Sequence, residues 1–133
     1  MGTLIDASVL IDAERGEFDL DALFARLPDE DFAIAAITAS ELIHGVLRAG
    51  SSKQRELRAE FVGGVLNGYR VVPFDLSVAR VHAKIWTDLM RRGSMIGERD
   101  LMIAATAIAF GFDLATRDQR SFPRIRGLKL TRL

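Results

Sequence analysis

The 133-residue chain contains no cysteine, only three prolines, and a single tryptophan and tyrosine. The absence of cysteine excludes a disulfide framework, a cysteine-ligated zinc site and a cysteine nucleophile. Few prolines and a hydrophobic content of 49% exclude a disordered or collagen-like chain. The chain also lacks the glycine-rich loops of phosphate-binding folds and the GxSxG elbow of serine hydrolases. These absences leave a soluble globular domain whose chemistry does not depend on sulfur.

The chain also has no long apolar run and no excess of charge. Its longest apolar segments, around 33–37 and 101–112, fall short of the roughly 18 residues that a membrane span needs. An acid at position 6 is atypical of a signal peptide, so we expect a cytoplasmic protein with no membrane partner. Its 18 basic and 18 acidic side chains give a net charge of zero, whereas a dedicated nucleic-acid-binding domain is strongly basic. Ten acids but only two bases lie in residues 1–41, which predicts one acidic face or pocket.

Strand-like and helix-like segments alternate along the chain. Apolar runs predict strands at 3–5, 32–37, 69–74 and 112–115, with a further edge strand at 128–130. Helical periodicity and capping residues predict helices at about 8–15, 20–27, 38–49, 52–66, 76–92 and 98–110, with a turn at 67–68. The length suits one domain, 1–133. The alternation predicts an α/β sandwich of three layers, with a mostly parallel sheet of four or five strands flanked by helices.

Four acids occupy the positions at which such sheets bind ligands. Asp6 and Asp118 directly follow the first and fourth strands, and Glu41 and Asp100 lie in the first turns of helices that begin at the same edge. Carboxylates brought together there would repel one another and raise one another's pKa. A divalent cation removes that conflict, and oxygen-only ligands suit Mg²⁺ or Mn²⁺. The pattern therefore predicts a metal site.

Each acid also has a purely structural explanation. Asp6 can cap the helix that follows it, Glu41 can complete a capping box begun at Thr38, Asp100 can interact with a helix dipole, and Asp118 can shape a turn. The interpretation that all four acids lie at one sheet edge by coincidence is the less favoured one.

The acids lie in four short motifs: LIDASVLI from residue 4, TASEL from 38, DLMIAATA from 100, and TRD from 116 with Phe122 beyond it. In this order they resemble the motifs of PIN-domain ribonucleases and, more narrowly, of the VapC toxins of bacterial toxin–antitoxin pairs. The resemblance covers almost the whole chain and implies a PIN-like fold and metal-dependent cleavage of RNA. It implies that the catalytic acids are Asp6, Glu41, Asp100 and Asp118, and that the metal ligands are Asp6, Asp100 and Asp118.

The resemblance implies further roles and partners. Ser8 and Thr116 match polar residues that orient the first acid. A homodimer is implied, as is a cognate antitoxin that blocks the acidic pocket with a C-terminal segment. Glu98 is an extra carboxylate two residues before Asp100, and residues at that spacing point to different sides of a helix, so both are not expected to bind the metal.

The expected reaction follows from charge. A phosphodiester is repelled by four acids unless one or two metal ions invert the field and activate a water, which leaves a 5′-phosphate and a 3′-hydroxyl. Cations outside the acidic centre must hold the backbone, and the nearest in sequence are Arg117, Arg120, Arg124 and Arg99. The alternative is a non-catalytic PIN-like module that binds RNA or a protein. A receiver or a haloacid-dehalogenase-like phosphatase is disfavoured. The receiver type needs a lysine near the last strand, where this chain has Thr116-Arg117-Asp118, and Ser8 stands where the phosphatase has a second Asp.

Overall fold

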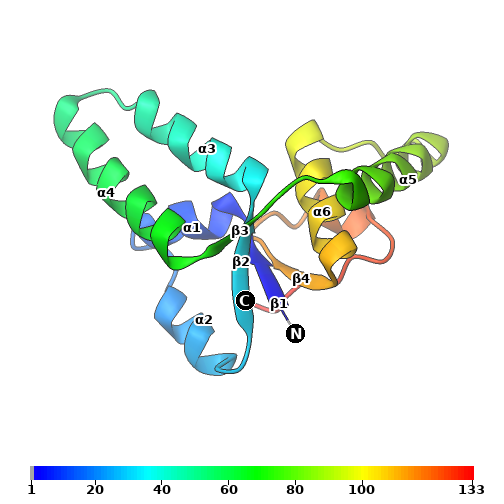
Figure 1. Cartoon of the computed structure of the whole chain (residues 1–133), viewed down its shortest axis with the longest axis horizontal. Helices are drawn as coiled ribbons and strands as arrows, with labels where there is room; N and C mark the ends of the chain where they lie inside the picture. The colour runs from blue at the N-terminus through cyan, green and yellow to red at the C-terminus, as the bar shows by residue number, and fades with distance from the viewer. Residues whose placement is uncertain (1) are drawn as a thin grey trace.

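The computed structural model describes residues 2–133 as a parallel β-sheet with helices on both faces (Figure 1). The strands are β1 (Gly2–Ile5), β2 (Asp31–Ala35), β3 (Arg70–Val72) and β4 (Phe112–Ala115). The helices are α1 (Ala7–Glu14), α2 (Leu20–Arg26), α3 (Ala36–Leu47), α4 (Ser52–Gly68), α5 (Leu76–Arg92) and α6 (Glu98–Phe110), followed by a short 3₁₀ turn at Phe122–Arg124. The three-layer α/β sandwich predicted from the sequence is confirmed.

Side chains that fit the helix ends explain why most of these helices begin and end where they do. The carboxylates of Asp19 and Asp75 and the hydroxyl of Ser51 accept the free backbone N–H groups at the starts of α2, α5 and α4, at 3.0, 3.1 and 3.2 Å. Gly93 and Gly111 end α5 and α6 in the left-handed conformation, with φ of 62° and 69°. The N-terminal caps and C-terminal glycines expected from the sequence are confirmed at these positions.

Two apolar cores lie on opposite faces of the sheet. On one face, α5 and α6 bury residues that include Leu89, Leu101 and Ile103. On the other face, α1, α3 and α4 bury residues that include Leu10, Leu42 and Val62. Figure 1 shows α1, α3 and α4 to the left of the strands and α5 and α6 to the right. Both faces of the sheet are covered, as a parallel sheet requires.

The strand order changes direction once, at the centre of the sheet. The order is β3-β2-β1-β4, and all neighbouring strands are parallel. The chain runs outward from β1 through β2 to β3 and then returns to add β4 on the other side of β1. The strand order therefore reverses between β1 and β4, which is where open parallel sheets bind ligands.

The structure corrects the predicted boundary between the second strand and the third helix. The strand expected at 32–37 ends at Ala35, and α3 begins at Ala36 with no side-chain cap. The capping box expected between Thr38 and Glu41 is therefore wrong, because Thr38 lies inside the helix and is fully buried. Glu41 consequently lies in the second turn of α3, not in the first.

Two smaller predictions are also wrong. The turn expected at 67–68 is the last part of α4, because the amide of Tyr69 still bonds to the carbonyl of Val65 and continues the helical pattern. The edge strand expected at 128–130 is reduced to a single parallel bridge between Leu114 and Leu130. The left-handed Gly127 turns the chain immediately before this bridge, which leaves room for only one paired position. In residues 2–133, no helix has both the length and the apolar character that crossing a membrane demands.

Candidate functional site

Asp6 lies at the centre of the candidate site, at the end of β1. Its carboxylate is buried, with 6% of the residue exposed, and its backbone N–H bonds to the carbonyl of Ala115 at the end of β4. The hydroxyls of Ser8 and Thr116 both donate to Oδ2 of Asp6, each at 2.8 Å. Since both hydroxyls share one oxygen, Oδ1 is the oxygen left to bind a ligand. Within residues 2–133, the Asp6 side chain makes no capping bond to α1, so its structural explanation as a helix cap is wrong.

The same two hydroxyls hold the loop that follows β4. Ser8 Oγ accepts the backbone N–H of Arg117 at 3.0 Å, and Thr116 Oγ1 accepts the backbone N–H of Asp118 at 3.0 Å. Each hydroxyl therefore donates to Asp6 and accepts from the loop that carries Asp118. These bonds connect the ends of β1 and β4, and they fit the orienting roles expected for Ser8 and Thr116.

Asp118 is fixed by a tight turn. Its Oδ1 accepts backbone N–H groups from Arg120 at 2.8 Å and Ser121 at 3.1 Å. Burial acts to raise the pKa of the Asp118 carboxyl, but these bonds outweigh it and hold that pKa below its ordinary value. Asp118 therefore shapes a turn, as its structural explanation proposed, and it also remains ionised beside the other acids.

Glu41 and Asp100 approach the same point from α3 and α6. The pKa of Glu41 is raised by burial and then by the charges of Asp6 and Asp100, while Arg99 opposes the shift. The pKa of Asp100 is raised by burial and then by the charges of Asp6 and Asp118. Such shifts require carboxylates that are close to one another. The structure therefore brings the four predicted acids together at the edge where β1 and β4 end.

The acidic cluster contains an unsatisfied oxygen. Oε1 of Glu41 is buried and has no hydrogen-bond partner among the described residues. A buried carboxylate oxygen without a partner is costly and calls for an ion or a donor. Although the carboxylates interact, no group of three or more histidine or acidic side chains within residues 2–133 is arranged so that it could hold a metal ion.

The donor set of the cluster suits a hard divalent cation. The candidate ligands are carboxylate oxygens from Asp6, Glu41, Asp100 and Asp118, and Mg²⁺ and Mn²⁺ prefer such ligands together with water. A cation would also relieve the repulsion that raises the pKa of Glu41 and Asp100. The residues therefore fit the expected metal in donor chemistry, in the partner-free oxygen and in charge, while the positions of the side chains do not yet form a set of three metal ligands.

The four arginines expected to contact substrate lie in different surroundings. Arg99 faces the cluster and lines an open cleft with Glu41 and Asp100. Arg117 pairs with Asp12 of α1 at 3.0 Å. Arg124 donates to the carbonyl of Met95, also at 3.0 Å, while Arg120 is exposed. Two of the four act on the acids through their charge: Arg99 acts to lower the pKa of Glu41, and Arg120 acts to lower that of Asp118.

The structure also answers which acid of α6 belongs to the cluster. Asp100 interacts with Asp6 and Asp118. Glu98 is exposed and also lines the open cleft, but it is not among the charges that shift the pKa of Glu41 or Asp100. Sequence reasoning missed Ser121, whose hydroxyl lowers the pKa of both Asp100 and Asp118. Its position three residues after Asp118, typical of a side chain in an Asp-initiated turn, was the available signal.

Comparisons with known proteins identify the family of the chain. Residues 3–128 match the PIN domain family. The chain is 32% identical to "Ribonuclease VapC1" of Rickettsia felis over 130 residues, which covers 98% of this chain and 95% of that protein. It is 33% identical to "tRNA(fMet)-specific endonuclease VapC" of Salmonella typhimurium over 97 residues, covering 73% and 71% of the two chains.

Solved structures give the same result. The fold superposes with a TM-score of 0.89 and 26% identity on a chain in the crystal structure of VapBC2 from Rickettsia felis bound to a promoter DNA fragment, covering 98% of both chains. It superposes with a TM-score of 0.83 and 29% identity on a chain of FitAcB from Neisseria gonorrhoeae, covering 97% and 96%.

Proposed function

Because the chain belongs to the PIN-domain family and to its VapC branch, we propose that it is a metal-dependent endoribonuclease and the toxin of a toxin–antitoxin pair. The observation that carries the proposal is the meeting of Asp6, Glu41, Asp100 and Asp118 at the point where the strand order reverses. The names of the relatives as ribonucleases and endonucleases support a nuclease that acts on RNA.

Each residue of the cluster has a distinct part in the proposed reaction. A Mg²⁺ or Mn²⁺ ion held there would supply charge neutralisation and would lower the pKa of the water needed to attack the phosphodiester. Asp6, Asp100 and Asp118 would hold the cation, with Ser8 and Thr116 keeping Asp6 turned so that Oδ1 faces it.

Glu41 completes the proposed machinery. Its raised pKa and partner-free Oε1 suit a group that orients the attacking water or accepts its proton. The expected products carry a 5′-phosphate and a 3′-hydroxyl, because this route needs no help from the ribose 2′-hydroxyl.

The proposed partners follow from the relatives. The solved VapBC and FitAcB structures are toxin–antitoxin complexes by name, which supports a protein antitoxin for this chain. We expect that partner to cover the acidic cluster, and we expect a homodimer. The Salmonella relative is named for tRNA(fMet), so tRNA is the first RNA to test.

A cleavage assay with matched variants tests the proposal. The purified partner-free protein is incubated with bacterial total RNA and with tRNA in Mg²⁺, Mn²⁺ or EDTA, and new ends are mapped. Wild type should cut at discrete positions only with metal, and Asp6→Asn should lose about 100-fold or more of the rate. Asp29→Asn, at an exposed loop acid, is the control and should cut as wild type does.

The alternative is a module that binds RNA or protein without cleaving it. Metal-independent cutting, or equal cutting by wild type and Asp6→Asn, would contradict the proposed mechanism. RNA binding without cutting in either metal would favour the binding module.

A further inference from the structure

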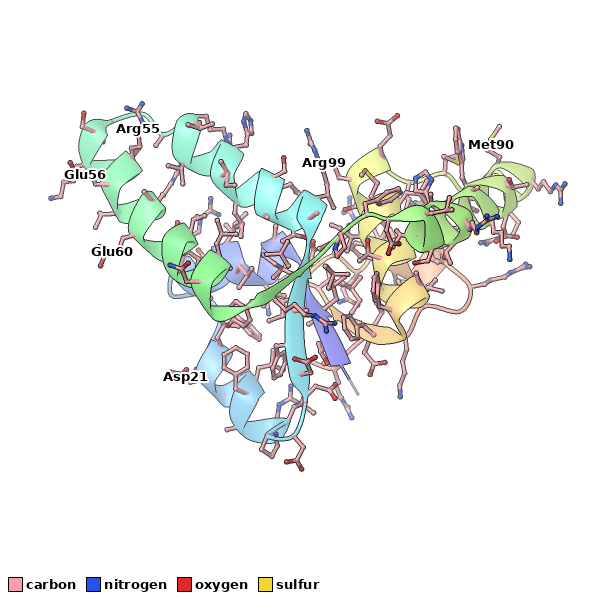
Figure 2. The ribbon with its side chains drawn as sticks, in the orientation of Figure 1. Asp21, Arg55, Glu56, Glu60, Met90 and Arg99 are labelled. Atoms are coloured by element: carbon pink, nitrogen blue, oxygen red, sulfur yellow. The ribbon has the colours of Figure 1, made fainter. Side chains whose placement is uncertain are left out.

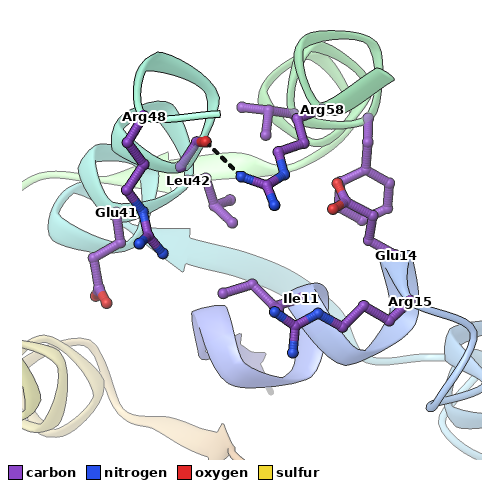
Figure 3. Close-up of a pocket in the computed structure, with 10 residues that line it drawn as sticks. Ile11, Glu14, Arg15, Glu41, Leu42, Arg48 and Arg58 are labelled. Atoms are coloured by element: carbon purple, nitrogen blue, oxygen red, sulfur yellow. Dashed lines mark hydrogen bonds between the residues drawn. The ribbon is translucent and has the colours of Figure 1, made fainter. Parts of the chain in front are cut away.

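Three arginines from three helices point into one pocket beside the acidic cluster. Arg15 follows α1, Arg48 follows α3 and Arg58 lies in α4, and their guanidinium groups converge between these helices (Figure 3). The pocket has a volume of about 80 Å³, which is below the roughly 300–1,000 Å³ of small-molecule sites and suits a group no larger than a small anion. Glu41 lines it as well, so the pocket opens directly onto the proposed catalytic centre.

The arginines of this pocket keep most of their hydrogen-bond donors available. Within residues 2–133, none of the three forms an ion pair, whereas Arg92, Arg117 and Arg126 do. Arg58 uses one N–H group on the carbonyl of Gly45, at 3.0 Å (dashed line in Figure 3). Each guanidinium offers five donors in a rigid fork, so many remain for an incoming anion.

The remaining lining is partly apolar. Leu42 and Val62 are buried in the core beneath the pocket, and Phe61 is half-buried at its side. Glu14 is an exposed carboxylate at the rim. The pocket thus combines a cationic wall with an apolar floor, and its volume suits a single phosphate group.

We propose that this pocket binds a phosphate of the RNA next to the one that is cleaved, with Arg15, Arg48 and Arg58 as its ligands. The inference rests on the proposed nuclease function and adds the site that holds the substrate. An RNA strand cannot remain at a four-carboxylate centre unless cations bind its neighbouring phosphates. Of the arginines nearest to the acids in sequence, Arg117 and Arg124 already have protein partners.

Arginine is well suited to this task, because its planar fork binds phosphate oxygens through two parallel bonds. Arg15 and Arg48 also lie at helix C-termini, where any cation is favoured by the dipole. The helix dipole explains why a cation is favoured at these two positions. It does not explain why both side chains point into the same pocket as Arg58. The shared pocket is the observation that points to a ligand.

RNA binding by matched variants tests the inference. A short fluorescein-labelled single-stranded RNA is titrated in Mg²⁺ by fluorescence anisotropy, in an Asp100→Asn background that prevents cleavage. Arg15→Ala and Arg48→Ala should each weaken binding by about tenfold. The double variant should reduce the slope of log affinity against log salt by about 0.7, since the arginines share one phosphate and each lost phosphate contact accounts for about 0.7 on a single strand.

The control is Arg55→Ala. Arg55 is an exposed arginine at the start of α4 that lies outside the pocket (Figure 2). It should change neither affinity nor slope. Arg58 is not replaced, because its bond to Gly45 supports the fold. If the alanine double variant folds poorly, the Arg15→Lys/Arg48→Lys variant, which keeps the charges and loses the forks, should weaken binding while retaining the slope.

A second probe separates RNA from an acidic protein segment. A labelled poly-glutamate peptide of matched charge should bind weakly and respond equally to all variants. If instead it binds tightly and loses affinity only with Arg15→Ala and Arg48→Ala, the pocket is a protein-docking site and the inference is wrong.

Cleavage by the wild-type protein, measured in parallel, distinguishes a failure of the pocket proposal from a failure of the proposed nuclease function. Unchanged RNA affinity and slope in the double variant, together with metal-dependent cutting by wild type, would overturn this pocket and leave the nuclease standing. If wild type neither binds nor cuts RNA, the proposed function fails and this inference fails with it.

Discussion

Repulsion between carboxylates gives Asp100 an unusual effect on stability. Burial and the charges of Asp6 and Asp118 raise its pKa in the folded protein. A carboxyl with a raised folded pKa stabilises the fold fully below its ordinary pKa, and this stabilisation is lost as pH rises through the raised value. Without metal at neutral pH, Asp100→Asn should therefore raise the melting temperature by a few degrees and reduce its fall between acidic and neutral pH.

Thermal melting in EDTA across that pH range checks this expectation. Asp29→Asn, which replaces an exposed acid outside the cluster, should leave both the melting temperature and its pH dependence unchanged. A lower melting temperature for Asp100→Asn would mean that Asp100 chiefly stabilises the N-terminus of α6.

The hydroxyl of Thr116 should matter for both activity and stability. It donates to Asp6 and accepts from the amide of Asp118, so Thr116→Val breaks both bonds with little change of shape. We expect a loss of about 1–3 kcal/mol in the free energy of unfolding and about 10–100-fold in cleavage rate. Urea denaturation and the cleavage assay measure the two effects.

Thr131→Val is the matched control, because the buried hydroxyl of Thr131 has no partner among the described residues. Its replacement should be neutral or slightly stabilising. If the two variants behaved alike, the hydroxyl network around Asp6 would have no special role.

At the scale of elements, one ion pair joins the loop after β4 to α1. Arg117 bonds to Asp12 at 3.0 Å and lies 5.4 Å from the ring centre of Phe18. Since both charged groups are partly exposed, a double-mutant cycle with Arg117→Ala and Asp12→Ala should give a coupling of about 0–1 kcal/mol by urea denaturation. Arg120→Ala, on the same loop, should show no coupling to Asp12→Ala, and a coupling of several kcal/mol at Arg117 would contradict this account.

The elements also show what the sequence could predict and where it failed. The start of α5 and the end of α6 were predictable, because Asp75 and Gly111 act through local geometry. The start of α3 was not, because the apolar run 32–37 suits a strand or a buried helix equally. The strand ends at Ala35, where its pairing partner Val72 also ends, and that pairing depends on a segment far along the chain.

At the scale of the whole molecule, parallel strands brought the predicted acids to one edge even where a helix boundary was wrong. Asp6 and Asp118 follow adjacent strands, so their meeting depends only on sheet order. The arginine pocket was not predictable, because Arg15, Arg48 and Arg58 come from three helices whose mutual packing leaves no local sequence pattern.

The central claim is that the four carboxylates form a site for a divalent cation. Calorimetric titration of the metal-free protein with Mn²⁺, supported by melting temperatures in the same solutions, tests it most directly. Wild type should bind Mn²⁺ and gain about 2.7 kcal/mol of stability at a hundredfold excess over the dissociation constant. Asp100→Asn should bind far more weakly, while Asp29→Asn should match wild type. If wild type showed neither heat of binding nor a higher melting temperature, the acidic cluster would not be a metal site.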